Sequence, residues 1–301
     1  MSKILITGAS GLIGTRLIEM LLQHGHEVVR LSRSKGLLQE RNVQSFVWDV
    51  SKGTVEEEAF HGVDAVVHLA GASVADQRWT EKRKREILES RTKSTALLAQ
   101  FIERNPQVKV LISASGIGYY GEGTDHVFTE EDKQGSDFLA LVVDAWEKKA
   151  NKIPCKRIVK LRTGIVLSEK GGALKEMMAP IKFFVGAPLG TGRQYMSWIH
   201  IDDLCRMFIK AIEDETMNGV YNATGPYAVT NTELTTAIAK VLRRPLWLPN
   251  VPGFVLKILL GEMADMVLTG SQVSSKKIQQ KGFQFQFSDL HQALENLLRK
   301  S

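Results

Sequence analysis

The chain of 301 residues is long enough to bury a sizeable core, in one large domain or two coupled ones. Its 44% hydrophobic and 24% charged residues are ordinary for a soluble globular protein, and its only two cysteines, Cys155 and Cys205, exclude a disulfide framework and a CxxC metal site. The formal net charge of +6 does not by itself indicate nucleic acid, because the densest basic run, EKRKRE at 81–86, contains no aromatic residue and fits a solvated helix face.

No targeting segment or membrane span is expected. The residues after Met1 lead directly into a strand, without the charged start and apolar run of a signal peptide. The most apolar late segment, 251–270, carries Lys257, Glu262 and Asp265, which predicts an amphipathic core helix instead of a membrane span. We therefore expect a cytoplasmic protein without a membrane partner, a nucleic-acid partner or a metal site, and the sequence leaves its oligomeric state open.

The N-terminal stretch, 3–34, predicts a strand, a glycine-punctuated turn, a helix and a second strand. Gly8 permits a tight turn, Gly11 lets the backbone approach a pyrophosphate, and Gly14 lets the helix pack against the strand. The exposed amides at the start of the helix then face anionic phosphates. The sequence therefore predicts a dinucleotide site in this turn, formed by Gly8, Ser10, Gly11, Leu12, Ile13 and Gly14.

The glycine spacing of this turn, GxxGxxG within TGASGLIG, resembles the short-chain dehydrogenase/reductase superfamily, and in particular its extended branch of sugar-nucleotide epimerases. The stretch VDAVVHLAG at 63–71 resembles the fourth strand of that branch. The resemblance implies that Leu69, Ala70 and Gly71 lay their backbone against the adenosine and ribose side of a dinucleotide. His68 is then expected to be a packed strand residue and not a ligand.

The end of the second strand indicates which dinucleotide is bound. An NAD site usually places an acid there to accept hydrogen bonds from the ribose hydroxyls, whereas this chain has Ser32 and Arg33, with Arg30 nearby. A guanidinium suits a 2′-phosphate by its charge and by its bidentate geometry. The sequence therefore predicts NADP as the cofactor, and the alternative is that Arg33 is a surface arginine that follows a strand.

The predicted helix at 81–102 carries an arginine within its packing stripe, since Arg91 shares one face with Ile87 and Leu98. Such an arginine is costly unless it reaches an anion or a water-filled cleft. In extended relatives this helix lies along the cofactor, which implies that Arg91 reaches it, held by Glu86 a turn earlier. The alternative is that Arg91 snorkels past the edge of the helix, and the sequence does not separate the two.

The later chain adds strands at 108–115 and 157–167, which extend a parallel doubly wound sheet. By resemblance, Val166 lines the nicotinamide side. The segment GRQYMSWIHIDDL resembles the stretch of the extended branch in which paired acids start a helix, so Asp202 and Asp203 are predicted to be N-terminal caps. The last segment, from Gln280, predicts a strand and then a helix capped near Ser288.

As a whole, the chain resembles epimerase-family proteins of the atypical short-chain dehydrogenase group, whose C-terminal segment is a small domain of unknown role. This resemblance implies an α/β fold: a Rossmann-type doubly wound parallel sheet with a smaller C-terminal substrate domain. We expect an NADP-binding domain over 1–225, with a substrate-lining excursion at about 168–195. The substrate domain is expected over 226–301, with the C-terminal segment of the family at about 246–297.

The catalytic pair of the superfamily is missing from its expected place. The family typically uses Tyr-x-x-x-Lys, in which the lysine lowers the pKa of the phenol, but no lysine lies four residues after any of the five tyrosines. Aligning the helix over 137–150 on Glu147 puts Leu139 and Val143 at the tyrosine and lysine positions. An enzyme would therefore need a relocated acid or base, for which the candidates are Ser115, Tyr120 and His200. The residues expected on the substrate side are Ser113, Tyr119 and Arg193.

Three functions remain open from the sequence. The first is an NADP-dependent epimerase or oxidoreductase that acts on an unknown small carbonyl or sugar-nucleotide-like substrate. The second is a non-catalytic sensor that binds NADP(H), and the third is a scaffold that keeps only the fold. The intact glycine turn and Arg33 argue against the scaffold. The missing Tyr-x-x-x-Lys favours the sensor without excluding the enzyme, since a hydride moves wherever a carbon abuts the nicotinamide.

Overall fold

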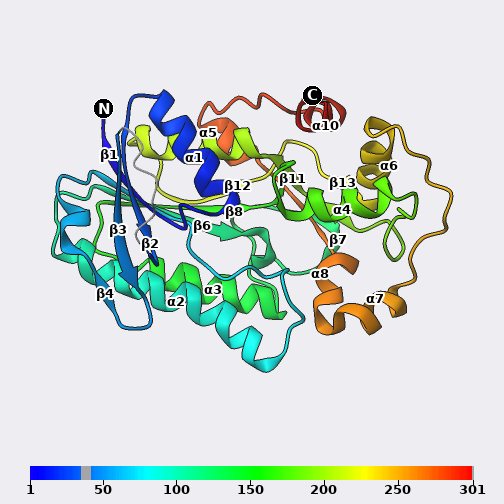
Figure 1. Cartoon of the computed structure of the whole chain (residues 1–301), viewed down its shortest axis with the longest axis horizontal. Coiled ribbons are helices and arrows are strands. Elements are labelled where there is room, and N and C mark those ends of the chain that lie inside the picture. Colours follow the sequence, from blue (N-terminus) through cyan, green and yellow to red (C-terminus); the bar gives the residue numbers. More distant parts are fainter. Residues whose placement is uncertain (35–41, 300–301) are drawn as a thin grey trace.

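The computed structural model describes residues 1–34 and 42–299, which form an eight-stranded sheet between two layers of helices (Figure 1). The strand order is β12-β8-β6-β5-β1-β2-β3-β4, and every neighbouring pair is parallel except β3 with the edge strand β4. The strands are β1 (Lys3–Thr7), β2 (Glu27–Ser32), β3 (Val43–Asp49), β4 (Thr54–Val55), β5 (Ala65–His68), β6 (Val110–Gly116), β8 (Arg157–Thr163) and β12 (Gly219–Ala223).

Helices cover both faces of this sheet, which confirms the predicted doubly wound fold. In Figure 1, α1 (Leu12–Gln23) and α5 (Ile201–Glu213) lie above the sheet, while α2 (Glu81–Glu103) and α3 (Phe138–Ala150) lie below it. The central strand β1 is apolar on both sides because both sides are covered. Ile4 and Ile6 belong to the core beneath α1, and Leu5 between them belongs to the core on the α2 side, as the alternation of a strand requires.

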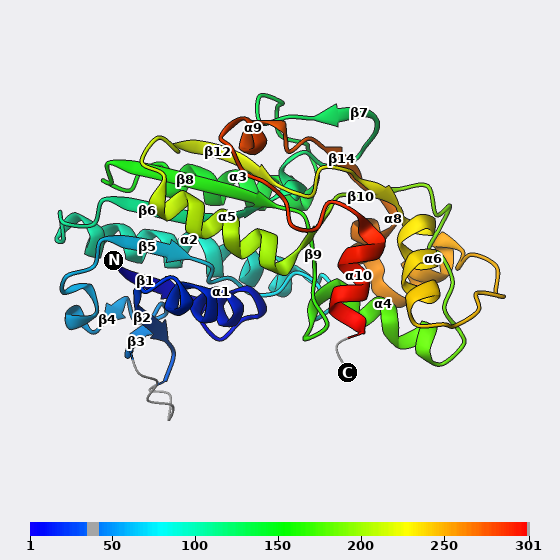
Figure 2. The same ribbon diagram turned by 90° about the horizontal axis from the view of Figure 1, so that it is seen from above.

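Many of the remaining elements, among them α4, α6, α8 and α10, gather at one end of the molecule, on the right in Figure 2. Three small two-stranded sheets pair β7 with β14, β9 with β11 and β10 with β13. These strands are β7 (Gly123–Phe128), β9 (Ile165–Leu167), β10 (Tyr195–Met196), β11 (Trp198–His200), β13 (Val229–Thr230) and β14 (Ser271–Val273). The other helices are α4 (Gly172–Lys182), α6 (Asn231–Val241), α7 (Gly253–Leu260), α8 (Asp265–Leu268), α9 (Lys276–Gln280) and α10 (Leu290–Leu298), and the 3-10 turns are η1 (Glu57–Phe60), η2 (Ile117–Tyr119) and η3 (Gly261–Ala264).

One hydrophobic core runs through both of the domains predicted from the sequence, 1–225 and 226–301. The cluster on the α1 face begins at Ile4 and continues to Leu294 and Leu297 of α10. In addition, β14 from the late chain pairs with β7, which precedes α3. The C-terminal segment therefore packs as an extension of the sheet layers.

The prediction of an amphipathic core helix over 251–270 is wrong. The chain forms α7, then η3 and then α8, because α7 ends at Gly261, whose φ of +64° is in the left-handed region. Three apolar side chains of α7, those of Phe254, Ile258 and Leu259, are more than 60% exposed. No helix in the described part of the chain is long and apolar enough to cross a membrane.

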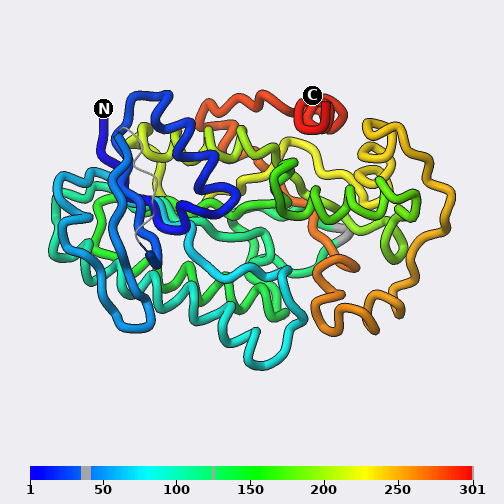
Figure 3. The backbone as a smooth tube through the Cα atoms, in the orientation of Figure 1, coloured from blue at the N-terminus to red at the C-terminus, as the bar shows by residue number. Residues whose placement is uncertain are grey.

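The predicted strand near the C-terminus is also wrong, because other groups bind its backbone. The carboxylate of Asp203 accepts hydrogen bonds from the backbone N–H groups of Gln286 and Phe287, both at 2.9 Å. Figure 3 shows this late segment, in red, running along the face of the molecule that carries α5. The cap of α10 is Asp289, which accepts from the Gln292 N–H at 2.9 Å, so the predicted cap Ser288 is one residue early.

The paired acids before α5 do not cap it. Its N-cap is His200, whose Nδ1 accepts from the Asp202 N–H at 3.1 Å. Asp202 instead accepts a hydrogen bond from Arg16 of α1 at 2.6 Å, and Asp203 is fully buried beneath the C-terminal segment. Both acids lie in the first turn, where the helix dipole favours negative charge, but their partners come from other elements.

Candidate nucleotide-binding site

The turn after β1 has a backbone geometry that only glycine fits at two positions. Gly8 has a φ of +69°, and a Cβ there would lie 2.8 Å from the carbonyl carbon of Leu69. A Cβ on Gly14 would collide with the Gly8 carbonyl oxygen and lie 2.8 Å from the Cα of Ala9. The turn is therefore pressed against the β5 loop on one side and folded onto the start of α1 on the other.

The turn opens on a helix start that no side chain caps. Gly11 is the N-cap of α1 and is exposed, and the first turn of the helix contains no acidic residue. The first amide groups of a helix have no partner within it, and its dipole places partial positive charge there. The backbone amides of Leu12, Ile13 and Gly14 thus form a site suited to a phosphate.

Two neighbouring loops meet this turn at the switch point between β1 and its neighbours. Thr7, the last residue of β1, pairs with Leu31 of β2 and with His68 of β5, so the chain after both strands reaches the same edge of the sheet. On the β2 side this places Ser32 and the exposed Arg33 beside the glycine turn. Open α/β sheets bind ligands at such a point.

On the β5 side, Leu69 to Gly71 are tied to the end of β1. The Leu69 N–H donates to the Thr7 carbonyl oxygen at 3.2 Å, and the Ala70 N–H donates to Thr7 Oγ1 at 3.3 Å. A Cβ on Gly71 would lie 3.1 Å from the Cζ atom of Arg91, so the guanidinium lies directly beside this loop.

Arg91 is half buried and has no carboxylate partner among the described residues. Its Nη1 donates to the carbonyl oxygens of Ala72 and Ile87, each at 3.0 Å, and the guanidinium lies 5.2 Å from the Trp146 ring centroid. Burial, together with the charge of Arg83, lowers its pKa to about 10. Glu86 does not hold Arg91 as expected, because its carboxylate accepts from Arg83 at 2.8 Å. Arg91 therefore brings an unneutralised positive charge to this edge.

His68 links the glycine turn to α2 and is fully buried, as the packed-residue expectation requires. Since Thr7 Oγ1 accepts from Ala70, its hydroxyl hydrogen is free to donate to His68 Nδ1, 2.7 Å away. Thr95 donates its own hydroxyl hydrogen to the Arg91 carbonyl oxygen and so accepts from His68 Nε2 at 3.1 Å. We infer the neutral tautomer with hydrogen on Nε2.

Burial, and secondarily the charge of Arg91, lowers the pKa of His68 to about 3 from its ordinary value of 6.5. The unfolded chain therefore binds more protons between these values, and the stability that neutral His68 contributes is lost as the pH falls through this window. We expect His68 to account for a loss of about 1.4 kcal/mol per pH unit in the free energy of unfolding below about pH 6. Denaturant titrations of the wild type and of His68→Gln from pH 7 to pH 4 measure the difference, and parallel curves would contradict this assignment.

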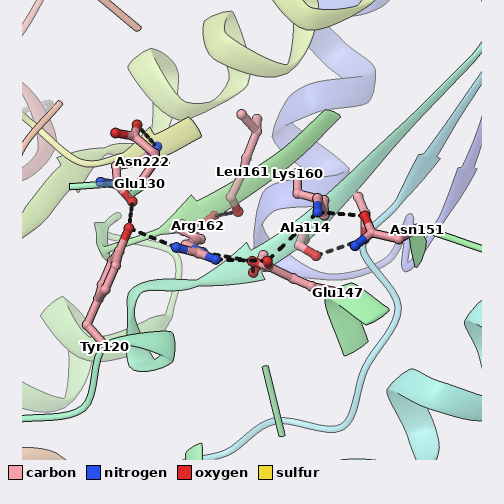
Figure 4. Close-up of polar contacts among 12 residues, drawn as sticks. Ala114, Tyr120, Glu130, Glu147, Asn151, Lys160, Leu161, Arg162 and Asn222 are labelled. Atoms are coloured by element: carbon pink, nitrogen blue, oxygen red, sulfur yellow. Dashed lines mark hydrogen bonds and ion pairs between the residues drawn. The ribbon is translucent and has the colours of Figure 1, made fainter. Parts of the chain in front are cut away.

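A buried polar network lies on the α3 face of β6 and β8 (Figure 4). The carboxylate of Glu147, on α3, accepts from Ser115 Oγ at 2.6 Å and from Nε and Nη2 of Arg162 at 2.8 and 2.9 Å. Arg162 Nη1 donates to the Tyr120 hydroxyl at 3.0 Å, and that hydroxyl donates to Asn222 Oδ1 at 2.7 Å. All five side chains are more than 90% buried.

Two of the sequence-based catalytic candidates belong to this network: Ser115 of β6 and Tyr120, which directly follows η2. Ser115 donates to Glu147, and burial raises the pKa of Tyr120 to about 12, although Arg162 partly opposes the shift. Tyr119 lies flat against the guanidinium of Arg162, whose Cζ is 3.4 Å from its ring centroid. Ser113 is 1% exposed in the middle of β6, where it donates to the Ala114 carbonyl oxygen.

Leu139 and Val143 project toward the carboxyl end of β6. A Cβ on Gly118 would lie 3.2 Å from the Cβ of Leu139, and a Cβ on Gly116 would lie 3.8 Å from a methyl carbon of Val143. The two positions of α3 that align with the tyrosine and lysine of the superfamily therefore face the carboxyl end of β6. Both carry apolar side chains.

The structure places the other predicted residues apart from this network. His200 is 1% exposed, stacks on Phe287 at 3.8 Å between ring centroids, and lies on the α1 side of the sheet. There it borders a small groove of about 110 Å³ together with Leu12. Val166 is on β9, opposite Ile199 of β11. Arg193 is exposed in the turn before β10, and no hydrogen bond or ring contact among the described residues joins it to Ser113 or Tyr119.

Sequence reasoning missed most members of the buried network. Lys160 and Arg162 lie on either side of Leu161 in β8, and both face α3, where Lys160 donates to Asn151 at 2.6 Å. Two cations on one face of a buried strand require an acidic partner on the element that covers it. The sequence signal that could have identified this acidic partner is Glu147, which lies within the apolar stripe of α3.

The doubly wound sheet and the site formed after β1, β2 and β5 define a nucleotide-binding α/β protein. The model of the NAD dependent epimerase/dehydratase family matches residues 4–140, and that of a domain of unknown function, DUF1731, matches residues 251–297. The epimerase family protein YfhF of Bacillus subtilis is 38% identical over 300 residues, which are 98% of each chain. The chloroplastic SDR39U1 homolog of Arabidopsis thaliana is 37% identical, over 98% of this chain and 86% of that protein.

Solved structures agree with these sequence matches. The human epimerase family protein SDR39U1 (isoform 2), in a crystal structure with NADPH, superposes with a TM-score of 0.89 at 32% identity, covering 99% of this chain and 100% of that one. A nucleoside-diphosphate sugar epimerase from Corynebacterium glutamicum superposes with a TM-score of 0.79 at 30% identity, covering 99% of this chain and 58% of that one. The chain belongs to the NAD dependent epimerase/dehydratase family and ends in a DUF1731 domain.

Proposed function

We propose that this protein binds NADP(H) at the edge formed by the loops after β1, β2 and β5. The observation that carries the proposal is the glycine turn, which leaves no space for a side chain at Gly8 and Gly14 and opens on the uncapped start of α1. The residues that would hold the cofactor are those named from the sequence: Gly8, Ser10, Gly11, Leu12, Ile13, Gly14, Ser32, Arg33, Leu69, Ala70, Gly71, Arg91 and Val166. Glu86 leaves this set, because its carboxylate is paired with the buried guanidinium of Arg83.

Arg33 supports NADP over NAD, and the human relative was crystallised with NADPH. We expect Arg33→Asp to weaken NADPH binding by about tenfold to a hundredfold, because one charge-assisted hydrogen bond contributes about 1.5–3 kcal/mol. NADH binding should be unchanged or tighter, since an acid accepts from the ribose hydroxyls. Fluorescence titration of both cofactors measures the preference. Equal affinity of the wild type for NADPH and NADH would refute the choice of NADP.

Arg91 supports the proposal by its charge, since no described carboxylate neutralises it beside Gly71. We expect Arg91→Ala to weaken NADPH binding by about tenfold or more, in line with one hydrogen bond to a charged group. The melting temperature should fall by only a few degrees, because the side chain hydrogen-bonds only two carbonyl oxygens. A large fall in melting temperature at unchanged affinity would show that Arg91 is structural.

When bound, the cofactor supplies a carbon that gives or accepts hydride, so a reaction on a small carbonyl or sugar-nucleotide-like substrate is the first form of the proposal. In this form the part over 1–225 holds the cofactor and the part over 226–301 contributes to the substrate side. The chain itself must move the proton. Leu139 and Val143 have no proton to exchange, so the donor would be Ser115, Tyr120 or His200.

The second form is a non-catalytic NADP(H) sensor. It is favoured because all three candidate proton donors already make hydrogen bonds within the protein. Ser115 and Tyr120 are committed to Glu147 and Asn222, while His200 caps α5. Stereospecifically deuterated NADPH, incubated with a broad set of carbonyl metabolites, separates the two forms. Label transfer that Tyr120→Phe or His200→Ala slows at least tenfold would establish the enzyme. Stoichiometric NADPH binding without any transfer would establish the sensor.

A further inference from the structure

Exposed apolar side chains are concentrated in two segments of the later chain. Eleven large hydrophobic side chains of the described residues are exposed, and seven of them lie within 177–201 or 234–261. Their exposed fractions run from 44% for Phe184 to 79% for Phe183. The seven are Phe183, Phe184, Val185, Trp247, Phe254, Ile258 and Leu259. Soluble proteins seldom expose such a group unless a partner covers it.

The same two segments contain no acidic residue. They carry six basic residues, which are Lys182, Arg193, Lys240, Arg243, Arg244 and Lys257. The rest of the chain has the other 33 of the 39 basic residues and all 33 acidic ones, so it is formally neutral. The whole net charge of +6 therefore resides in the segments that also expose the apolar side chains.

Contacts join the two segments into one surface. Trp247 Nε1 donates to the Phe184 carbonyl oxygen at 2.9 Å, and the guanidinium of Arg244 lies 4.6 Å from the Phe184 ring centroid. A β-bridge connects Leu189 to Val251, just before α7. Figures 1 and 2 both place the loop after α4 and the loop after α6 at the same end of the molecule. We name the seven apolar and six basic side chains the aromatic–basic surface.

Five of the six cations of the aromatic–basic surface have no carboxylate partner among the described residues. All six are exposed, and only Lys257 has a carboxylate within 4.0 Å, that of Asp265. Exposed cations beside aromatic and aliphatic side chains attract an anionic layer that also offers an apolar interior. Phenylalanine and tryptophan enter the boundary between lipid headgroups and acyl chains, while lysine and arginine contact anionic headgroups.

We propose that the aromatic–basic surface binds the protein peripherally to anionic lipid bilayers. The two grooves described in the structure lie along α1 and α5, and neither is lined by a side chain of the aromatic–basic surface. The surface includes the loop after α4, the loop after α6 and side chains of the short helix α7, at one end of the molecule. The proposal departs from the sequence-based expectation of no membrane partner, which rested on the missing signal-peptide pattern and on the charged residues within 251–270.

Co-sedimentation of the full chain with vesicles tests the proposal. The vesicles contain phosphatidylcholine alone or with one third phosphatidylglycerol. We expect the wild type to pellet only with the anionic vesicles and to be released by high salt, which screens exposed charges. Lys182→Gln combined with Lys257→Gln should weaken binding about twenty-five-fold, since each cation near an anionic surface contributes a factor of about five. Phe183→Ser combined with Trp247→Ser should weaken it at least tenfold by removing the inserted rings.

The matched control is Leu141→Ser, which removes a 54% exposed side chain of α3 outside the aromatic–basic surface and should leave binding unchanged. Melting temperatures and NADPH affinity of all variants establish that the fold and the cofactor site are intact. Absence of wild-type binding, equal binding to neutral vesicles, or equal loss in Leu141→Ser would overturn the proposal. A wild-type dimer that ignores vesicles and dissociates in Phe183→Ser with Trp247→Ser would also overturn it, because a second copy would then cover the surface.

Discussion

Glu147→Ala is expected to lower the free energy of unfolding by about 3–5 kcal/mol, the cost of removing one partner from a buried ion pair. The substitution leaves the guanidinium of Arg162, which is 3% exposed, without its carboxylate. It also takes the acceptor from Ser115 and the nearest negative charge from Lys160, whose Nζ lies 3.9 Å from the Glu147 carboxylate. Chemical denaturation monitored by circular dichroism measures the loss.

Two variants make this expectation specific. Glu89→Ala removes a carboxylate of α2 that binds Lys93 at the surface, and we expect it to cost no more than about 0.5 kcal/mol. Glu147→Leu combined with Arg162→Met removes both charges together, so it should be less destabilising than Glu147→Ala. A loss below about 1 kcal/mol in Glu147→Ala, or a double variant worse than the single one, would contradict a buried pair whose charges depend on each other.

Gly14→Ala is expected to weaken NADPH binding by at least about a hundredfold, equivalent to about 2.7 kcal/mol. The added Cβ would meet the Gly8 carbonyl oxygen and lie 2.8 Å from the Cα of Ala9, and backbone atoms cannot move aside as a flexible side chain does. The turn must therefore shift away from α1, which misplaces the amides of Leu12 and Ile13. Isothermal titration with NADPH measures the effect.

Gly171→Ala is the matched control for this substitution. Gly171 has an extended backbone, and its Cβ would make only an ordinary contact of 3.6 Å with the side chain of Leu12. We expect NADPH affinity within about threefold of the wild type, because no backbone atom of the turn is displaced. If Gly14→Ala binds NADPH as tightly as Gly171→Ala does, the cofactor does not depend on this turn, and the proposed site fails.

The sequence alone predicted the fold class and the nucleotide edge, because both depend on local patterns. Short apolar strands, helical stripes and the spacing of Gly8, Gly11 and Gly14 are each set within a few residues of chain. The carboxyl ends of parallel strands lie at the same edge of a sheet. Arg33 and Leu69 follow two such ends, so the sequence predicts that they lie beside the glycine turn. The absence of Tyr-x-x-x-Lys was likewise readable from the sequence.

Only the tertiary structure decided what the polar side chains do. Ser115 and Tyr120 bind Glu147 and Asn222, which are 32 and 102 residues away, and Asp203 binds a backbone 83 residues further on. The aromatic–basic surface is likewise invisible in either segment alone, since apolar runs are usually core. Periodicity shows which face of an element is buried but not which element covers it. A buried polar group takes the partner that the packing of distant elements brings within hydrogen-bond distance.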